Sequence, residues 1–218
     1  MRALSGTPPP VPGLQRSCCP GSGLHTFQPD VHRKLRRLSL RSKEVDYRER
    51  MISCYPIHPE IFDRLYEDWS TLERFQRTRG VLRLMASVIH ELWMSNDASS
   101  MIMPGSIPLD VPNVREELIR YLDEGWNSIV SNEIDGKSSV PYQKDQSVPR
   151  YGQKLAARRV ARTIMLGSAP TVRAQSVRGI EASRIRLGVV QPGENIADFN
   201  DALNTCGAPW LSVHKPHW

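Results

Sequence analysis

Apolar side chains recur every three or four residues between positions 71 and 93, and this period predicts a long amphipathic helix. The positions that carry the stripe are Leu72, Phe75, Leu82, Ala86, Ile89 and Trp93. Ser70 or Thr71 is the expected N-cap, and Glu73 would support the first turn. We expect the rest of the chain to be organised around this helix.

A second amphipathic helix is predicted directly before it, from the prolines at positions 56 and 59 to about Trp69. Its apolar stripe consists of Ile57, Ile61, Leu65 and Trp69. Because the two helices are joined by so short a connection, we expect an antiparallel pair with a shared core. His58 has no nucleophile or acid beside it that would favour catalysis, so we interpret it as structural.

Proline, glycine and serine follow the long helix and indicate a connector up to position 109. Asp110 and Pro112 then begin another helix, with Val114 and Leu118 facing inward. The stretch 132–149 is rich in polar residues, glycine and proline, and its composition is typical of a linker.

Three shorter helices are predicted at 154–166, 179–189 and 194–205, an order typical of a helix-turn-helix core. In the first, the expected inward residues are Leu155, Val160 and Ile164. The expected outward residues, which are candidate nucleic-acid contacts, are Lys154, Arg158, Arg159 and Arg162. The third helix would enter a DNA groove, yet it carries three acids and no lysine or arginine. Packing against an acidic partner module therefore explains the basic residues as well as duplex binding does.

Charge is distributed unevenly along the 218 residues, whose net charge is +6. From 137 to 190 there are 11 Lys or Arg residues against 2 Asp or Glu. The first 44 residues are rich in proline, glycine and serine, and we expect them to be disordered. The sequence has no secretory signal and no apolar run that would span a membrane, so the expected location is cytoplasmic. The four cysteines have neither zinc-ligand nor disulfide spacing, and no catalytic or metal-binding residue is predicted.

Arg79 and Arg83 are the main candidates for ligand contact. They stand one helical turn apart on the long helix, with Gly80 between them removing a side chain that would hold a ligand away. The two guanidinium groups repel each other, and a bound anion such as a phosphate would relieve that repulsion. Spacing alone equally fits two arginines on a solvated face.

Gly80-Val81-Leu82-Arg83 resembles the G-x-x-R of AAA+ ATPases, in which a helix of the small lid domain supplies the sensor-2 arginine. The blocks YPIHPE, FQRTRGVLRLMA, ARRVARTIMLGSAP, RGIEASRIRLGVVQPGE and FNDALN, in this order, resemble one family of large prokaryotic ATP-binding proteins. Members of that family are often encoded beside DNA methyltransferases in phage-defence islands. The similarity covers roughly Val45 to Asn204, and the opening segment does not resemble the family.

The resemblance implies a mainly α fold with a helical lid-like subdomain and a winged-helix-like three-helix module. The corresponding division of the chain is a non-homologous or disordered segment 1–44, a lid-like subdomain 45–131, a linker 132–152, the module 153–206 and an irregular tail 207–218. The resemblance also implies that Arg83, Arg79 and Gly80 bind ATP together with a nucleotide-binding core domain. DNA, a methyltransferase and other defence proteins are the further partners that it implies.

Neither a G-x-x-x-x-G-K-[ST] motif nor a strand ending in paired acids for Mg²⁺ occurs in the sequence. Phosphoryl transfer depends on those parts, so we expect no ATPase activity from this chain by itself. Three functions stay open at this point. The favoured one is a C-terminal portion of an ATP-binding AAA+ protein. The second is a nucleic-acid-binding module that uses the basic segment from Arg150 to Arg186. The third is a helical interaction protein without a ligand, or a truncated reading frame that is not stably folded.

Overall fold

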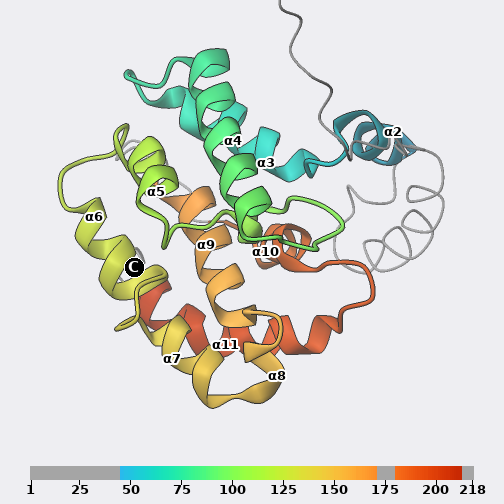
Figure 1. Ribbon diagram of the computed structural model, residues 1–218, viewed down its shortest axis with the longest axis vertical. Coiled ribbons are helices and arrows are strands. Elements are labelled where there is room, and N and C mark those ends of the chain that lie inside the picture. Colours follow the sequence, from blue (N-terminus) through green and yellow to red (C-terminus); the bar gives the residue numbers. More distant parts are fainter. Residues whose placement is uncertain (1–44, 171–179, 213–218) are drawn as a thin grey trace, which may run out of the picture.

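The computed structural model describes residues 45–170 and 180–212, and all regular secondary structure in those ranges is helical (Figure 1). This confirms the predicted α class. Among these residues the bridge between Ile57 and Ile102, an isolated parallel one, is the only β-type pairing. In the same ranges no helix is both long and apolar enough to cross a bilayer. The predicted disorder of 1–44 lies outside the described residues.

The helix predicted from the prolines at 56 and 59 to about Trp69 is present as a continuous series of helical turns. Helix α2 (Val45–Cys54) precedes α3 (Pro59–Asp63), which continues through a π turn (Arg64–Asp68) into a 3-10 turn (Trp69–Thr71). Of its predicted apolar stripe, Ile61, Leu65 and Trp69 are completely buried, and Ile57 is partly buried. The indole Nε1 of Trp69 donates a hydrogen bond of 2.7 Å to the carbonyl of Leu166, which ties this helix to a distant part of the chain.

The long helix α4 (Arg77–Met94) begins several residues later than predicted. The residue before its first turn is Gln76, and Leu72 has extended backbone, so neither Ser70 nor Thr71 caps it and Glu73 lies outside it. Its buried side is also not the predicted one. The residues of α4 that enter the core are Val81, Leu84, Met85 and Val88. They share that core with Ile61, Leu65 and Trp69, so the expected packing of the two helices is present.

The stretch predicted as a linker is largely helical. After α5 (Pro112–Ile119) and α6 (Trp126–Ile129), a π turn (Val130–Ile134) leads to α7 (Val140–Ser147) and α8 (Pro149–Gly152). Three of its polar residues are not solvated as the composition indicated. Ser139 is buried and accepts a hydrogen bond from the Tyr142 amide as the N-cap of α7, and Asp135 and Asp145 are buried as well.

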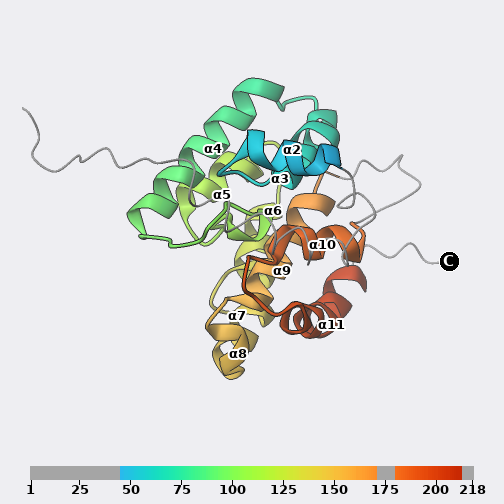
Figure 2. The ribbon, with the colours of Figure 1, turned by 90° about the vertical axis from the view of Figure 1, so that its right-hand side faces the viewer.

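Helix α9 (Ala156–Ser168) runs through the middle of the molecule in both views, with α4 at one end and α7 and α8 at the other (Figures 1 and 2). Every residue from Ala156 to Gly167 is buried. One side of α9 contributes Ala161, Met165 and Leu166 to the core that contains α4. Another side packs on α10 (Ala182–Val189) and α11 (Ile196–Ser212). The packing is therefore continuous across the predicted boundary between lid and module.

The three-helix order predicted for the second half is present as α9, α10 and α11. Helix α11 is longer than expected, because 207–212, predicted as irregular, continues it. The remaining residues of the predicted tail, 213–218, lie outside the described ranges.

His58 has the structural role that the sequence favoured. Its Nδ1 accepts a hydrogen bond of 3.1 Å from the Glu60 amide and so caps the N-terminus of α3, while its Nε2 lies 3.4 Å from the hydroxyl of Tyr47. The amide can only donate, so Nδ1 is unprotonated and the ring proton sits on Nε2. Burial lowers the pKa of His58 to about 4.

We predict that His58 makes the folded state less stable in acid. Between its ordinary pKa of 6.5 and its folded value of about 4, the unfolded chain binds a proton that the folded chain excludes. His58 therefore does not reduce the free energy of unfolding above pH 6.5. As the pH drops toward 4, the free energy of unfolding falls by up to about 3 kcal/mol. His58→Asn keeps an N-cap acceptor but does not titrate. Urea unfolding at several pH values should show wild type losing stability relative to the variant in acid, and a constant difference would contradict this account.

Candidate functional site

Arg79 and Arg83 both lie on the exposed side of α4. The Arg83 side chain is 47% exposed, and its Nη2 lies 2.8 Å from Oε1 of Glu117 on α5. The same carboxylate oxygen also accepts Arg120 at 2.8 Å. Arg79 is exposed as well. The structure thus brings the two predicted residues to one surface, with Arg83 held in place by a helix that the sequence did not indicate as its partner.

Gly80 has a different role from the predicted one. A Cβ atom placed on it would come within 3.0 Å of the ring of Phe75, so the missing side chain makes room for this ring. Phe75 is buried and meets Tyr121 edge-on, with ring centroids 5.0 Å apart. We therefore correct the assignment of Gly80, which opens space for the core side of the helix and not for a ligand.

The exposed side of α4 carries large apolar residues beside the two arginines. We call it the α4 surface, and it comprises Arg79, Leu82, Arg83, Ala86, Ile89, Trp93 and Met94. Leu82 is 65% exposed and Trp93 is 80% exposed. Four members of this surface, Leu82, Ala86, Ile89 and Trp93, belong to the predicted apolar stripe. Contiguous apolar surface of this kind is typical of sites that contact another protein.

A groove of about 330 Å³ runs along the C-terminal half of this surface. Its walls include Ile89 and Trp93 of α4, and Met101, Ile102 and Asp97 of the loop that follows. The α4 surface therefore has the exposed Leu82 toward one end and a groove at the other.

The basic residues predicted to face outward from α9 are paired with acids inside the molecule. Arg158, Arg159 and Arg162 are all less than 10% exposed, and Lys154 lies just before the helix. Nε of Arg158 lies 3.1 Å from Asp145, Nη1 of Arg159 lies 2.7 Å from Glu194, and Nζ of Lys154 lies 2.8 Å from Asp198. Arg162 binds Asp135 through Nε at 2.7 Å and Nη2 at 2.9 Å, and it also reaches Asp110 at 3.1 Å.

This pairing makes these residues poor candidates for contact with DNA phosphates. A DNA phosphate attracts lysine and arginine whose charge is free to meet it. Here each of the four cations already has a carboxylate, and Asp145 in addition accepts the amides of Ala157 and Arg158 at the start of α9. Sequence reasoning missed the pairing because the acids come from distant segments.

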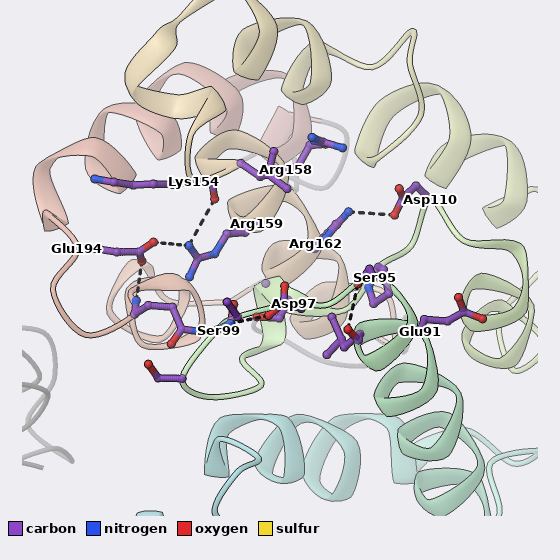
Figure 3. Close-up of a pocket in the computed structure, with 18 of the residues that line it drawn as sticks. Glu91, Ser95, Asp97, Ser99, Asp110, Lys154, Arg158, Arg159, Arg162 and Glu194 are labelled. Carbon is purple, nitrogen blue, oxygen red and sulfur yellow. Dashed lines mark hydrogen bonds and ion pairs between the residues drawn. The ribbon is translucent and has the colours of Figure 1, made fainter. Parts of the chain in front are cut away.

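The four basic residues do come together, around a cleft of about 880 Å³ (Figure 3). The cleft lies between the loop after α4, the start of α9 and the turn before α11, and acids such as Glu91 and Asp97 line the opposite side. Leu155, predicted to be inside, is 36% exposed on its wall and has a left-handed backbone with φ of 51°. Two buried atoms of lining residues, Nε of Arg159 and Oε1 of Gln191, have no hydrogen-bond partner.

The basic groups of this cleft are each matched by a carboxylate, so an anion gains no free counterion there. Within the two described ranges, no group of three or more acidic, histidine or cysteine side chains would hold a metal ion.

One comparison with known proteins gives a match. The model of the DUF499 family, second domain, matches residues 24–192, which is most of the chain. The match begins within the opening segment that was expected not to resemble the family, and it ends before the last predicted helix. No curated protein matches the chain, and no solved structure does.

We predict that Asp135→Ala severely destabilises the chain. Asp135 is fully buried and accepts Arg162 twice together with the Asp110 amide, so its removal leaves a buried guanidinium without its main counterion. The expected loss of unfolding free energy is about 3–5 kcal/mol.

Asp201→Ala is the matched control, because Asp201 pairs with Arg150 where both side chains are about half exposed. Its expected cost is less than about 1 kcal/mol. Chemical unfolding of the two variants measures both values, and equal losses would show that burial does not distinguish the two pairs.

Proposed function

The chain belongs to the DUF499 family, and on that premise we propose that it is the helical C-terminal portion of an ATP-binding protein of AAA+ type. In this proposal the nucleotide is held by a core domain. The chain contributes Arg83, and with it Arg79, to the phosphates.

The observation that carries the proposal is the composition of the α4 surface. Two exposed arginines, one turn apart, stand at the N-terminal end of a helix whose outer side is apolar. A core domain packed on the apolar part would exclude water around the arginines. Guanidinium groups bind phosphate with two parallel hydrogen bonds, and such charge-assisted bonds are strongest where water is excluded.

The Arg83–Glu117 ion pair fits a residue that exchanges partners. Glu117 keeps Arg120 as a counterion when Arg83 leaves, since both arginines contact the same oxygen. Moving Arg83 to a phosphate would therefore not leave a carboxylate unpaired. Because the original pair is partly exposed, breaking it costs little.

A second candidate function is a protein-interaction module without nucleotide chemistry. The exposed Leu82, Ile89 and Trp93 favour it, since they would bind a protein surface whether or not a nucleotide is present. The candidate partners in defence, namely DNA, a methyltransferase and other defence proteins, belong to the proposal for the whole protein. They rest on the family resemblance alone.

We predict that the chain hydrolyses no ATP by itself and that Arg83 matters once a core is present. In a complex of the chain with the ATP-binding core of a family member, Arg83→Ala should weaken ATP binding about tenfold, the value of one charge-assisted contact. Arg150→Ala is the control, because it removes an exposed arginine of α8 that pairs with Asp201 away from the α4 surface. Titration of the complexes with a fluorescent ATP analogue measures the affinities.

Two results would contradict the proposal. One is steady phosphate release by the purified chain, which would mean that it contains its own catalytic apparatus. The other is an equal effect of Arg83→Ala and Arg150→Ala, which would mean that ATP binding does not depend on the α4 surface.

A further inference from the structure

The α4 surface is complementary to itself when one copy is turned end for end. The exposed Leu82 lies in its N-terminal half, and a groove lined by Ile89 and Trp93 lies along its C-terminal half. Self-complementary surfaces of this kind form symmetric dimers in which each contact occurs twice. We propose that two copies of this chain pair through antiparallel α4 helices.

The apolar residues match in this arrangement. The stripe from Leu82 to Trp93 is centred between Ala86 and Ile89. Antiparallel pairing about that centre places Leu82 against the partner's Trp93, at the groove that the partner's Ile89 also lines, and places Ala86 against the partner's Ile89. A small residue near the axis allows the helices to approach to about 8–10 Å.

The positions of the charged residues favour antiparallel over parallel pairing of the two α4 helices. Arg79 stands near the N-terminal end of the surface, and Asp97, which lines the groove, follows the C-terminal end of α4. Antiparallel pairing brings Arg79 to the partner's Asp97 and to the carbonyl end of the partner helix, both of which attract a cation. Parallel pairing would instead place the arginines of the two copies together, where they repel.

Pairing leaves the internal contacts of each copy in place. Arg83 keeps Glu117, and Asp97 continues to accept the Ser99 amide at 2.8 Å. The surface that becomes covered is the one whose apolar side chains are now the most exposed in the described part of the chain, Trp93 at 80% and Leu82 and Met94 at 65% each. Burying large side chains of this kind stabilises an interface.

This inference goes beyond the proposed function, because it requires neither a nucleotide nor a core. A core domain and a second copy would cover the same surface, so they exclude each other, and the dimer is the state of the chain alone.

Sedimentation equilibrium of the purified full chain tests the pairing. We expect a reversible dimer that predominates at about 100 µM, as befits an interface of modest size. Leu82→Glu should weaken it at least about tenfold, since it places a charge against the partner's groove. Val140→Glu, which changes an exposed apolar residue on α7 in the same way, should leave the dimer unchanged. Circular dichroism confirms that each variant is folded.

A charge exchange tests the orientation. Arg79→Asp and Asp97→Arg should each weaken the dimer, and the double variant should recover most of the loss because the opposite charges meet again. A chain that stays monomeric, a dimer indifferent to Leu82→Glu, or a double variant that recovers nothing would each overturn the inference. None of these results bears on ATP binding by a complex with a core, which keeps its own test.

Discussion

The fold depends on the ion pair between Arg162 of α9 and Asp135. Helix α9 is buried on all sides and carries three arginines, and taking a guanidinium out of water costs several kcal/mol unless a carboxylate meets it. Asp135, with no exposed surface, accepts two nitrogens of Arg162 and the amide of Asp110. One carboxylate therefore fixes the central helix, the end of the π turn after α6 and the start of α5 relative to one another.

The other charges of α9 extend the same arrangement. Asp145 from α7, Glu194 from the turn before α11 and Asp198 from α11 each meet a cation at or near the start of the helix. Acids from several elements thus converge on one helix, and of the acids that pair with its arginines, Glu194 and Asp110 also line the cleft (Figure 3). Because the arginines of α9 are already paired with carboxylates inside the molecule, the arginines of α4 are the better candidates for contact with an anionic ligand.

The sequence predicted the existence of most helices but not which side α4 buries or that the arginines of α9 are buried. Periodicity identified α4, yet Val81, Leu84, Met85 and Val88 form a second apolar stripe at the same spacing, and only packing against α3 decides between the two. Arginines usually face water, so those of α9 were placed outside, because acids that lie tens of residues away cannot be assigned as partners from spacing. The polar stretch around Asp135 and Ser139 resembled a linker for the same reason. The role of His58 was predictable, because a cap needs only neighbouring residues.

The central claim is that α9 is held by specific coupling between its arginines and buried carboxylates. A double-mutant cycle with Arg162→Met and Asp135→Leu tests it most directly, with unfolding free energy as the measured quantity. Asp135→Leu leaves Arg162 with only the partly exposed Asp110, and Arg162→Met leaves the buried Asp135 without a cation. The double change leaves an apolar pair of similar size. The account predicts that the double variant loses at least about 2 kcal/mol less than the sum of the single losses. Losses that simply add would show that the two residues stabilise the fold independently and would contradict the account.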